Sequence, residues 1–266
     1  MPKKISSLQN SRVKYILQLS EKTKRRKAEG AFVIEGRREL SLAIKGGYEI
    51  QSLFYDPTLI DELNIKDYMT EKTNVSLISS KIYKKIAYRG STEGVIAIAK
   101  NRTHTLNDLD LKSEEPLILV VESAEKPGNV GALLRTADAA KVDAVIIANP
   151  KTDFYNPNVI RSSVGGVFTI PIATASSAET IDFLNENKIA IYSAILQQSE
   201  IYDKVNLKLA SAIVVGTEST GLSQKWRSAA SKKIRIPMMG LLDSMNVSVA
   251  AGILLYEARR QRKFSI

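Results

Sequence analysis

Continuous apolar runs dominate the second half of the chain. Four of them are long enough to form buried strands, at 117–122, 144–148, 189–194 and 212–216. Runs without polar alternation are typical of parallel strands that are covered on both faces. Helical patterns separate them, at 131–140, at 178–187 and at the C-terminus. We therefore predict a doubly wound α/β sheet, a fold that binds ligands in loops beyond the carboxyl ends of its strands.

The first half of the chain has shorter elements. Apolar residues in helical register predict a helix over 10–27 and another over 37–45, while apolar stretches predict strands at 31–35, 50–55, 75–78 and 94–99. Short helices are expected near Asp61 and Lys81. This pattern indicates a small α/β/α domain over 1–100, followed by a polar linker at 101–115 and a second domain over 116–266.

The last helix has an unusual composition. From Val247 to Tyr256 every residue except Ser248 is apolar or Gly, which predicts a helix buried on nearly all sides. Asp243, Ser244, Asn246 and Ser248 cluster at its N-terminus. Such residues cap helices. One helix needs only one cap, however, and its unpaired N–H groups and positive dipole end can also hold a ligand. From this segment alone, capping and ligand binding both remain open.

Composition narrows the possible chemistry. The absence of cysteine excludes disulfides, zinc–thiolate sites and cysteine nucleophiles. The single histidine, His104, lies in a polar stretch and is expected to be a solvated linker residue. No apolar run approaches the roughly 20 residues that span a bilayer, and the first residues lack the apolar region of a secretory signal. We expect a cytoplasmic protein with neither membrane partner nor metal.

Charge is unevenly distributed. Residues 1–100 contain 19 Lys and Arg against 11 Asp and Glu, whereas residues 101–266 contain 19 against 17. The first thirty residues alone carry nine basic side chains and two acidic ones. A strongly basic half beside a nearly neutral half favours a polyanion partner, and nucleic acid is the first candidate.

Three loops carry the polar signals of the second half. The strand at 117–122 is followed by a turn with Asn129 and then a helix with Arg135, and the strand at 212–216 is followed by Glu218 between two glycines. The third loop is 237–248. Each alone has an ordinary explanation, as a turn, a carboxylate at a helix N-terminus or a cap. No G-x-G-x-x-G follows a strand, which weighs against a nicotinamide-dependent oxidoreductase.

Taken together and in this order, the three loops resemble the SpoU family of RNA ribose 2′-O-methyltransferases in the SPOUT superfamily. The first motif, N-x-G-x-x-x-R, is Asn129, Gly131 and Arg135; the second, G-x-E-x-x-G-L, begins at Gly216. The third is IPM-x-G followed by SMNVS-x-A-x-G, over 236–252. Met245 replaces the usual Leu, an exchange that conserves volume. The resemblance covers about 115–262.

The resemblance implies a parallel sheet with a C-terminal trefoil knot, S-adenosylmethionine as cofactor and a homodimer with its catalytic site at or near the interface. The first domain is similar to the L30-like RNA-binding domain often attached to this family, through Asn10, Lys14 and the run FVIEG at 32–36. That agrees with the charge distribution.

The resemblance also implies roles for individual residues. The catalytic set is Arg135, Asn129, Glu218, Ser244 and Asn246, and the cofactor-binding set is Gly216, Ile236, Met245 and Ala194. RNA contacts are expected from Lys24, Arg25, Arg26 and Arg37. Arg135 has been proposed as a general base in the family. A guanidinium has a pKa above about 12, so a clamp on a neighbouring phosphate is the alternative for Arg135.

The expected function is methylation of a ribose 2′-hydroxyl in structured RNA, with 23S ribosomal RNA as the substrate. A tRNA 2′-O-methyltransferase is one alternative, and a non-catalytic RNA-binding protein that keeps the knotted fold is another. All five polar residues of the catalytic set are present, which argues against a degenerate enzyme.

Overall fold

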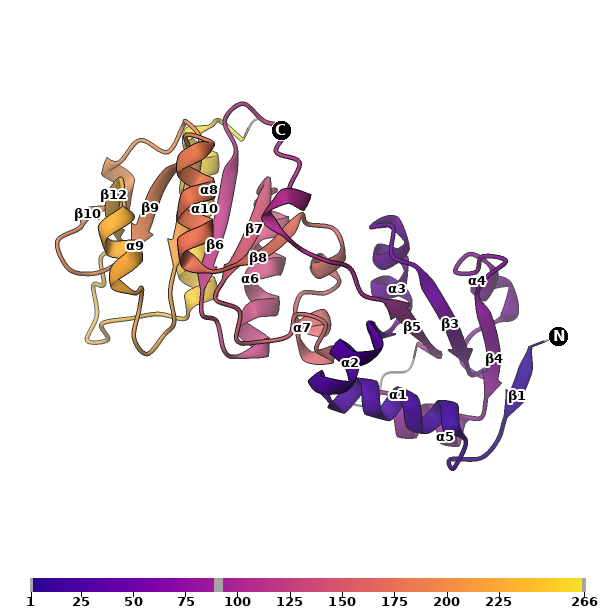
Figure 1. Cartoon of the computed structure of the whole chain (residues 1–266). Coiled ribbons are helices and arrows are strands. Elements are labelled where there is room, and N and C mark those ends of the chain that lie inside the picture. The colour runs from indigo at the N-terminus through magenta and orange to yellow at the C-terminus, as the bar shows by residue number, and fades with distance from the viewer. Residues whose placement is uncertain (1, 89–92, 265–266) are drawn as a thin grey trace. The chain divides into compact units, whose positions relative to one another are not determined.

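The chain forms two compact units in its computed structural model, which describes residues 2–88 and 93–264 (Figure 1). The first unit consists of Met1–Arg102 with Asp153–Thr169, and the second of Thr103–Thr152 with Ile170–Ile266. Within the described residues, no helix is long and apolar enough to cross a membrane, and no group of three or more His, Cys, Asp or Glu is placed to hold a metal ion.

The segment Asp153–Thr169 belongs to the first unit, although the predicted second domain covers 116–266 and therefore includes it. The ring of Tyr155 stacks on Phe32 with a centroid distance of 4.2 Å, and Phe168 meets Tyr48 edge-on at 5.1 Å. These aromatic contacts explain why the segment belongs to the first unit.

A mixed five-stranded sheet forms the centre of the first unit, in the order β1-β4-β3-β5-β2, with β5 antiparallel to both of its neighbours. The strands are β1 (Lys3–Ile5), β2 (Ala31–Glu35), β3 (Ile50–Tyr55), β4 (Asn74–Ile78) and β5 (Val95–Lys100). The helices up to Ile86 are α1 (Ser11–Glu21), α2 (Thr23–Glu29), α3 (Arg37–Lys45), α4 (Glu62–Lys66) and α5 (Ser80–Ile86). One apolar core joins α1 and α5 to the sheet. The predicted α/β/α architecture is present.

The helix predicted over 10–27 is two helices. Asn10 caps α1 by accepting a hydrogen bond from the backbone N–H of Arg12 at 2.9 Å. Lys22 adopts an extended conformation and interrupts the helix, and Gly30 ends α2 with a left-handed φ of 59°. The break turns α2 relative to α1 without any Gly or Pro between them.

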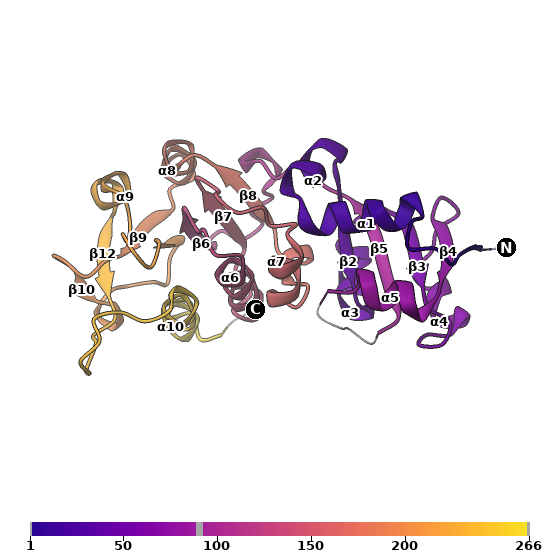
Figure 2. The ribbon, with the colours of Figure 1, turned by 90° about the horizontal axis from the view of Figure 1, so that it is seen from below.

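A seven-stranded, all-parallel sheet forms the second unit, in the order β10-β12-β9-β11-β6-β7-β8 (Figure 2). Its strands are β6 (Leu117–Glu122), β7 (Ala144–Ala148), β8 (Ile172–Ala175), β9 (Ala190–Ala194), β10 (Glu200–Ile201), β11 (Ser211–Val215) and β12 (Lys232–Arg235). The later helices are α6 (Pro127–Ala139), α7 (Pro157–Ser162, in the first unit), α8 (Ser177–Glu186), α9 (Gln224–Ala229) and α10 (Val247–Gln261). Figure 2 shows α8 and α9 on one face of this sheet and α6 and α10 on the other.

Two expectations need correction. The final helix is not buried on nearly all sides: α10 buries Ala251, Leu254, Leu255 and Ala258, but Val249 is 53% exposed and Tyr256 46% exposed. Only one face of α10 packs on the sheet and α6 of its own chain. Most of the predicted linker belongs to the second unit, which begins at Thr103. The carbonyl oxygen of His104 accepts a hydrogen bond from the N–H of Thr174 in β8 at 2.7 Å.

Candidate active site

The three polar loops meet at one place. They follow β6, β11 and β12, so the parallel sheet brings them to its carboxyl edge. The Nδ2 group of Asn129 donates a hydrogen bond to Oε1 of Glu218 at 3.1 Å, and Nδ2 of Asn246 donates to the same oxygen at 2.9 Å. Asn246 Nδ2 also lies 3.2 Å from Oδ1 of Asn129. We call these three residues the Glu218 cluster.

Glu218 accepts hydrogen bonds from both other members of this cluster, and its surroundings favour the ionised carboxylate. Its second oxygen, Oε2, accepts a hydrogen bond from Nζ of Lys126 at 2.8 Å. The hydrogen bond from Lys126 lowers the pKa of Glu218 most, and those from Asn129 and the backbone of Val247 lower it further, against a smaller rise from desolvation. With its oxygens occupied by donors, Glu218 fixes the positions of its neighbours and is a poor proton acceptor.

Asn246 serves both interpretations that the sequence left open. Its Oδ1 accepts a hydrogen bond from the backbone N–H of Ser248 at 2.9 Å, so it is the N-cap of α10. Its Nδ2 group belongs to the Glu218 cluster. Ser244 stands apart from that cluster and donates to Oδ1 of Asp243 at 3.2 Å.

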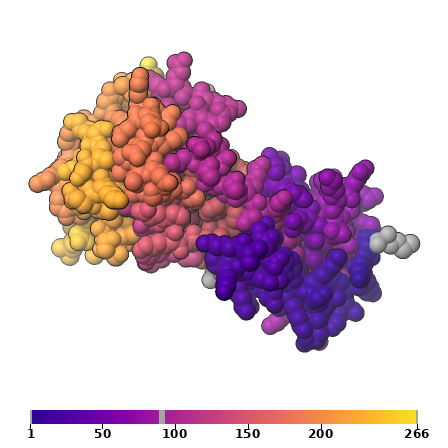
Figure 3. Space-filling model, viewed as in Figure 1, coloured from indigo at the N-terminus to yellow at the C-terminus, as the bar shows by residue number. Residues whose placement is uncertain are grey.

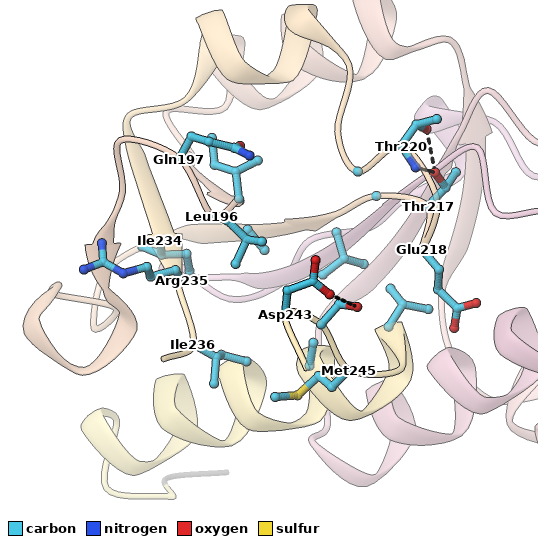
Figure 4. Close-up of a pocket in the computed structure, with 18 of the residues that line it drawn as sticks. Leu196, Gln197, Thr217, Glu218, Thr220, Ile234, Arg235, Ile236, Asp243 and Met245 are labelled. Atoms are coloured by element: carbon cyan, nitrogen blue, oxygen red, sulfur yellow. Dashed lines mark hydrogen bonds between the residues drawn. The ribbon is translucent and has the colours of Figure 1, made fainter. Parts of the chain in front are cut away.

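A cavity of about 360 Å³ lies beside the Glu218 cluster (Figure 4). All four predicted cofactor-binding residues line it: Ala194, Gly216, Ile236 and Met245. Ser244 and Glu218 line it as well. Figure 4 shows Leu196, Ile236 and Met245 around the cavity, together with the polar side chains of Thr217 and Asp243. This volume and this combination of apolar walls with a few polar groups are typical of a site for a small organic ligand, and they suit a flat base joined to a polar, charged tail.

Glycine at 216 has a structural reason. A Cβ atom there would lie 2.4 Å from the backbone carbon and oxygen of Gly221, a separation that real side chains do not tolerate. The loop returns so closely on itself that only glycine fits. This requirement comes from the loop's own backbone, and differs from close approach to a ligand.

Sequence reasoning missed Glu122, the last residue of β6. It is 4% exposed, and its carboxylate accepts hydrogen bonds from the N–H of Ser223 at 2.8 Å and from the Oγ of Ser177 at 3.0 Å. Trp226 donates to the Oγ of Ser177 at 3.0 Å. This buried network anchors the end of the loop that carries Glu218. A charged residue closing an apolar strand was the available signal.

Arg135 is not part of the Glu218 cluster. It lies on α6, six residues after Asn129, and this spacing puts the two side chains on different faces of the helix. Arg135 is exposed, and within the described residues it forms no hydrogen bond or ion pair. Of the five predicted catalytic residues, Glu218 and Ser244 line the cavity. Asn129 and Asn246 are hydrogen-bonded to Glu218, and Arg135 lies outside this group.

Comparison with known proteins decides the family. Residues 116–256, more than half of the chain, match the SpoU rRNA methylase family. The chain belongs to the SpoU rRNA methylase family. Residues 10–97 match the MRM3-like substrate-binding domain.

Individual SpoU relatives extend over both units. The chain is 36% identical to the 23S rRNA guanosine 2′-O-methyltransferase RlmB of Neisseria meningitidis, over 75% of this chain and 78% of that protein. It is 26% identical to the 23S rRNA guanosine 2′-O-methyltransferase RlmP of Bacillus subtilis, over 97% and 99%. A structure of an rRNA methyltransferase from Sinorhizobium meliloti with S-adenosylmethionine bound is 29% identical, covers 97% of both chains and superposes with a TM-score of 0.89.

Within the substrate-binding unit of this SpoU protein, the four predicted RNA-contacting residues differ in exposure. Lys24, Arg25 and Arg37 are exposed. Arg26 is 2% exposed, and its guanidinium donates to Asp153 at 2.6 Å and to the carbonyl oxygen of Leu19 at 2.6 Å. Arg26 therefore holds the unit together, and we remove it from the RNA-contacting set.

Proposed function

We propose that this protein transfers a methyl group from S-adenosylmethionine to a ribose 2′-hydroxyl of 23S ribosomal RNA. The chain is a SpoU-family RNA 2′-O-ribose methyltransferase, and S-adenosylmethionine is its methyl donor. The observation that carries the proposal is the Glu218 cluster beside the cavity of about 360 Å³, because residues from three motifs meet there. The 23S rRNA substrates of the relatives RlmB and RlmP favour ribosomal RNA over tRNA.

The residues of the cavity fit this donor. When bound, S-adenosylmethionine supplies an electrophilic methyl group on a sulfonium. The apolar side chains of Ala194, Ile236 and Met245 would hold the adenine, and the polar groups of Thr217 and Asp243 would hold the polar part of the molecule. The Glu218 cluster keeps two loops and the start of α10 in fixed positions, so the site needs little rearrangement when the reactants bind.

Arg135 holds the phosphate next to the target ribose and polarises the 2′-hydroxyl, while a phosphate oxygen or water takes the proton. A guanidinium suits the clamp because it stays protonated and presents several donors in one plane.

The protein acts as a homodimer in this proposal, and Arg135 of the partner subunit completes the site. Two observations support it. Arg135 lies away from the Glu218 cluster of its own chain, and exposed apolar residues concentrate at the C-terminal end. Of the eleven large apolar residues exposed in the described part of the chain, six are at Met239, Leu241, Leu242, Val249, Tyr256 and Phe264. A surface of this kind is typical of a subunit interface. We also propose that the C-terminal segment of this chain forms the trefoil knot of the family.

Mapping of 2′-O-methyl groups in total RNA, from cells with and without the protein, tests the substrate. We expect one ribose of 23S rRNA to lose its methyl group and to regain it when the purified protein and S-adenosylmethionine are added. A change confined to tRNA would instead support a tRNA methyltransferase. Unchanged methylation together with no binding of S-adenosylmethionine would support a non-catalytic RNA-binding protein.

A further inference from the structure

An open groove crosses the outer face of α1 and reaches α2. Five residues of α1 line it together with Arg25 of α2: Ser11, Arg12, Lys14, Tyr15 and Gln18. The spacing of Ser11, Lys14, Tyr15 and Gln18 puts these four on one side of the helix. The buried residues Val13, Ile16 and Leu19 lie on the other side. The indigo surface formed by the first helices is open to solvent in Figure 3.

The groove combines one aromatic ring with three cations. The guanidinium carbon of Arg25 lies 5.6 Å from the centroid of the Tyr15 ring, and Nη1 of Arg12 donates to the Oγ of Ser76 at 3.2 Å. No carboxylate is among the residues that line the groove. Glu29 at its edge pairs with Arg25 at 3.1 Å. That ion pair is exposed, so it contributes little and exchanges easily for another anion.

These features select a particular ligand chemistry. A planar ring flanked by cations matches a nucleotide, whose base stacks on the ring and whose phosphates pair with the cations. A base is free to stack only where RNA is unpaired, because in a duplex its faces are already covered by neighbouring bases.

We propose that the groove of α1 and α2 binds an unpaired nucleotide of the RNA substrate, with its base on Tyr15 and its phosphates on Arg12, Lys14 and Arg25. This proposal rests on the proposed function, in which RNA is the substrate, and it identifies where on the substrate-binding unit the RNA binds. The base takes the face of Tyr15 that Arg25 covers, and Arg25 moves from the ring to a phosphate.

The experiment uses the full-length chain and two probes, a single-stranded 12-residue RNA with one 2-aminopurine and a duplex RNA of the same length. Tyr15→Phe keeps the stacking face, whereas Tyr15→Leu keeps apolar volume without it. We expect Tyr15→Leu to bind the single strand about tenfold more weakly than wild type and Tyr15→Phe to bind it nearly as well. Quenching of 2-aminopurine fluorescence should survive in Tyr15→Phe and disappear in Tyr15→Leu.

Matched variants control for general effects of substitution. Tyr68→Leu changes a tyrosine of the same unit outside the groove and should leave binding of the single strand unchanged. The slope of log K for single-strand binding against log salt concentration measures the number of phosphate contacts. Lys14→Ala should reduce the magnitude of this slope by about 0.7, which corresponds to the loss of one phosphate contact. Lys66→Ala changes an exposed lysine on α4 and should leave the slope unchanged.

Two results would overturn the proposal: single-strand binding that is the same in Tyr15→Leu and wild type, or equal weakening for single strand and duplex. Failure of the proposed function is a separate result. It would appear as absent S-adenosylmethionine binding or absent methyl transfer by the wild-type protein, both of which are measured without reference to Tyr15.

Discussion

The Glu218 cluster of the second unit and the α1–α2 surface of the first unit differ in how their charged side chains are placed: the carboxylate of Glu218 is fixed by hydrogen bonds, whereas most cations of α1 and α2 are exposed. Glu218 accepts hydrogen bonds from Asn129, Asn246 and Lys126. On α2, Lys24 and Arg25 are exposed, and Glu29 is the one acidic residue of that helix. A reacting site gains from groups fixed within a fraction of an ångström, whereas a surface that attracts a polyanion gains from cations that remain available to phosphates.

The largest effect is expected from Arg135, which lies outside the Glu218 cluster and is proposed to act in catalysis. Arg135→Ala should lower the rate of methyl transfer by about 10²- to 10³-fold, because one charged donor to the reacting groups is lost. Binding of S-adenosylmethionine, measured by calorimetry, should persist because Arg135 does not line the cavity. Arg260→Ala, an exposed arginine that pairs with Glu257, should retain the wild-type rate. A near-normal rate in Arg135→Ala would remove Arg135 from the mechanism.

Arg25 and Arg26 are neighbours in the first unit, and their substitution should distinguish a contribution to stability from a contribution to RNA binding. Arg26→Ala leaves Asp153, whose side chain is only 10% exposed, without its partner and should cost about 3 kcal/mol of unfolding free energy. Arg25→Ala should change stability by about 0.5 kcal/mol or less and weaken RNA binding. Denaturant unfolding and RNA titration of both variants check this contrast. The assignment of Arg26 fails if it proves to be the residue whose loss affects only RNA binding.

The two roles of Asn246 can be separated by two substitutions. Serine is also a good N-cap, so Asn246→Ser should keep the stability of the protein, while Asn246→Ala should lose about 1 kcal/mol. Both lack the Nδ2 donor to Glu218, and both should transfer methyl groups about tenfold more slowly. Thermal unfolding and initial rates measure the two effects. If Asn246→Ser transferred methyl groups at the wild-type rate, capping alone would account for Asn246.

The smallest expected effect concerns pH. The folded-state pKa of Glu218 is lowered, first by Lys126, so the cluster is fully formed above the ordinary glutamate range and is lost as pH falls through the lower, folded-state pKa. Lys126→Met should raise that pKa and shift the loss to higher pH, which carbon-13 titration of the carboxyl group would record. Lys151→Met disrupts the neighbouring ion pair with Glu125 and should leave Glu218 unchanged. Equal titration curves for Glu218 in wild type and Lys126→Met would contradict the ion pair.

The sequence predicted the central strands well, but it did not predict β12, which lies between β10 and β9 near one end of the sheet. The runs at 117–122 and 144–148 coincide with β6 and β7, because strands buried on both faces are continuously apolar. β12 escaped notice, since its sequence KKIR has one buried residue, Ile234. The break at Lys22 was also missed, because neither Gly nor Pro marks it.

The site was predictable through its motifs, whereas the roles of single residues needed coordinates. Motif order placed Asn129, Glu218 and Asn246 together, but only geometry shows that one asparagine both caps a helix and joins the cluster. Arg26 looked like its basic neighbours, because a buried guanidinium has no separate signature in a basic run. Its partner Asp153 lies 127 residues away.

The segment Asp153–Thr169 makes the first unit impossible to isolate by a single cut. Residues 10–97 look like a self-contained module in sequence, yet a fragment ending at Arg102 would leave Phe32 without the ring of Tyr155 and Tyr48 without that of Phe168. Transplanting this unit onto another protein would therefore require both pieces of chain.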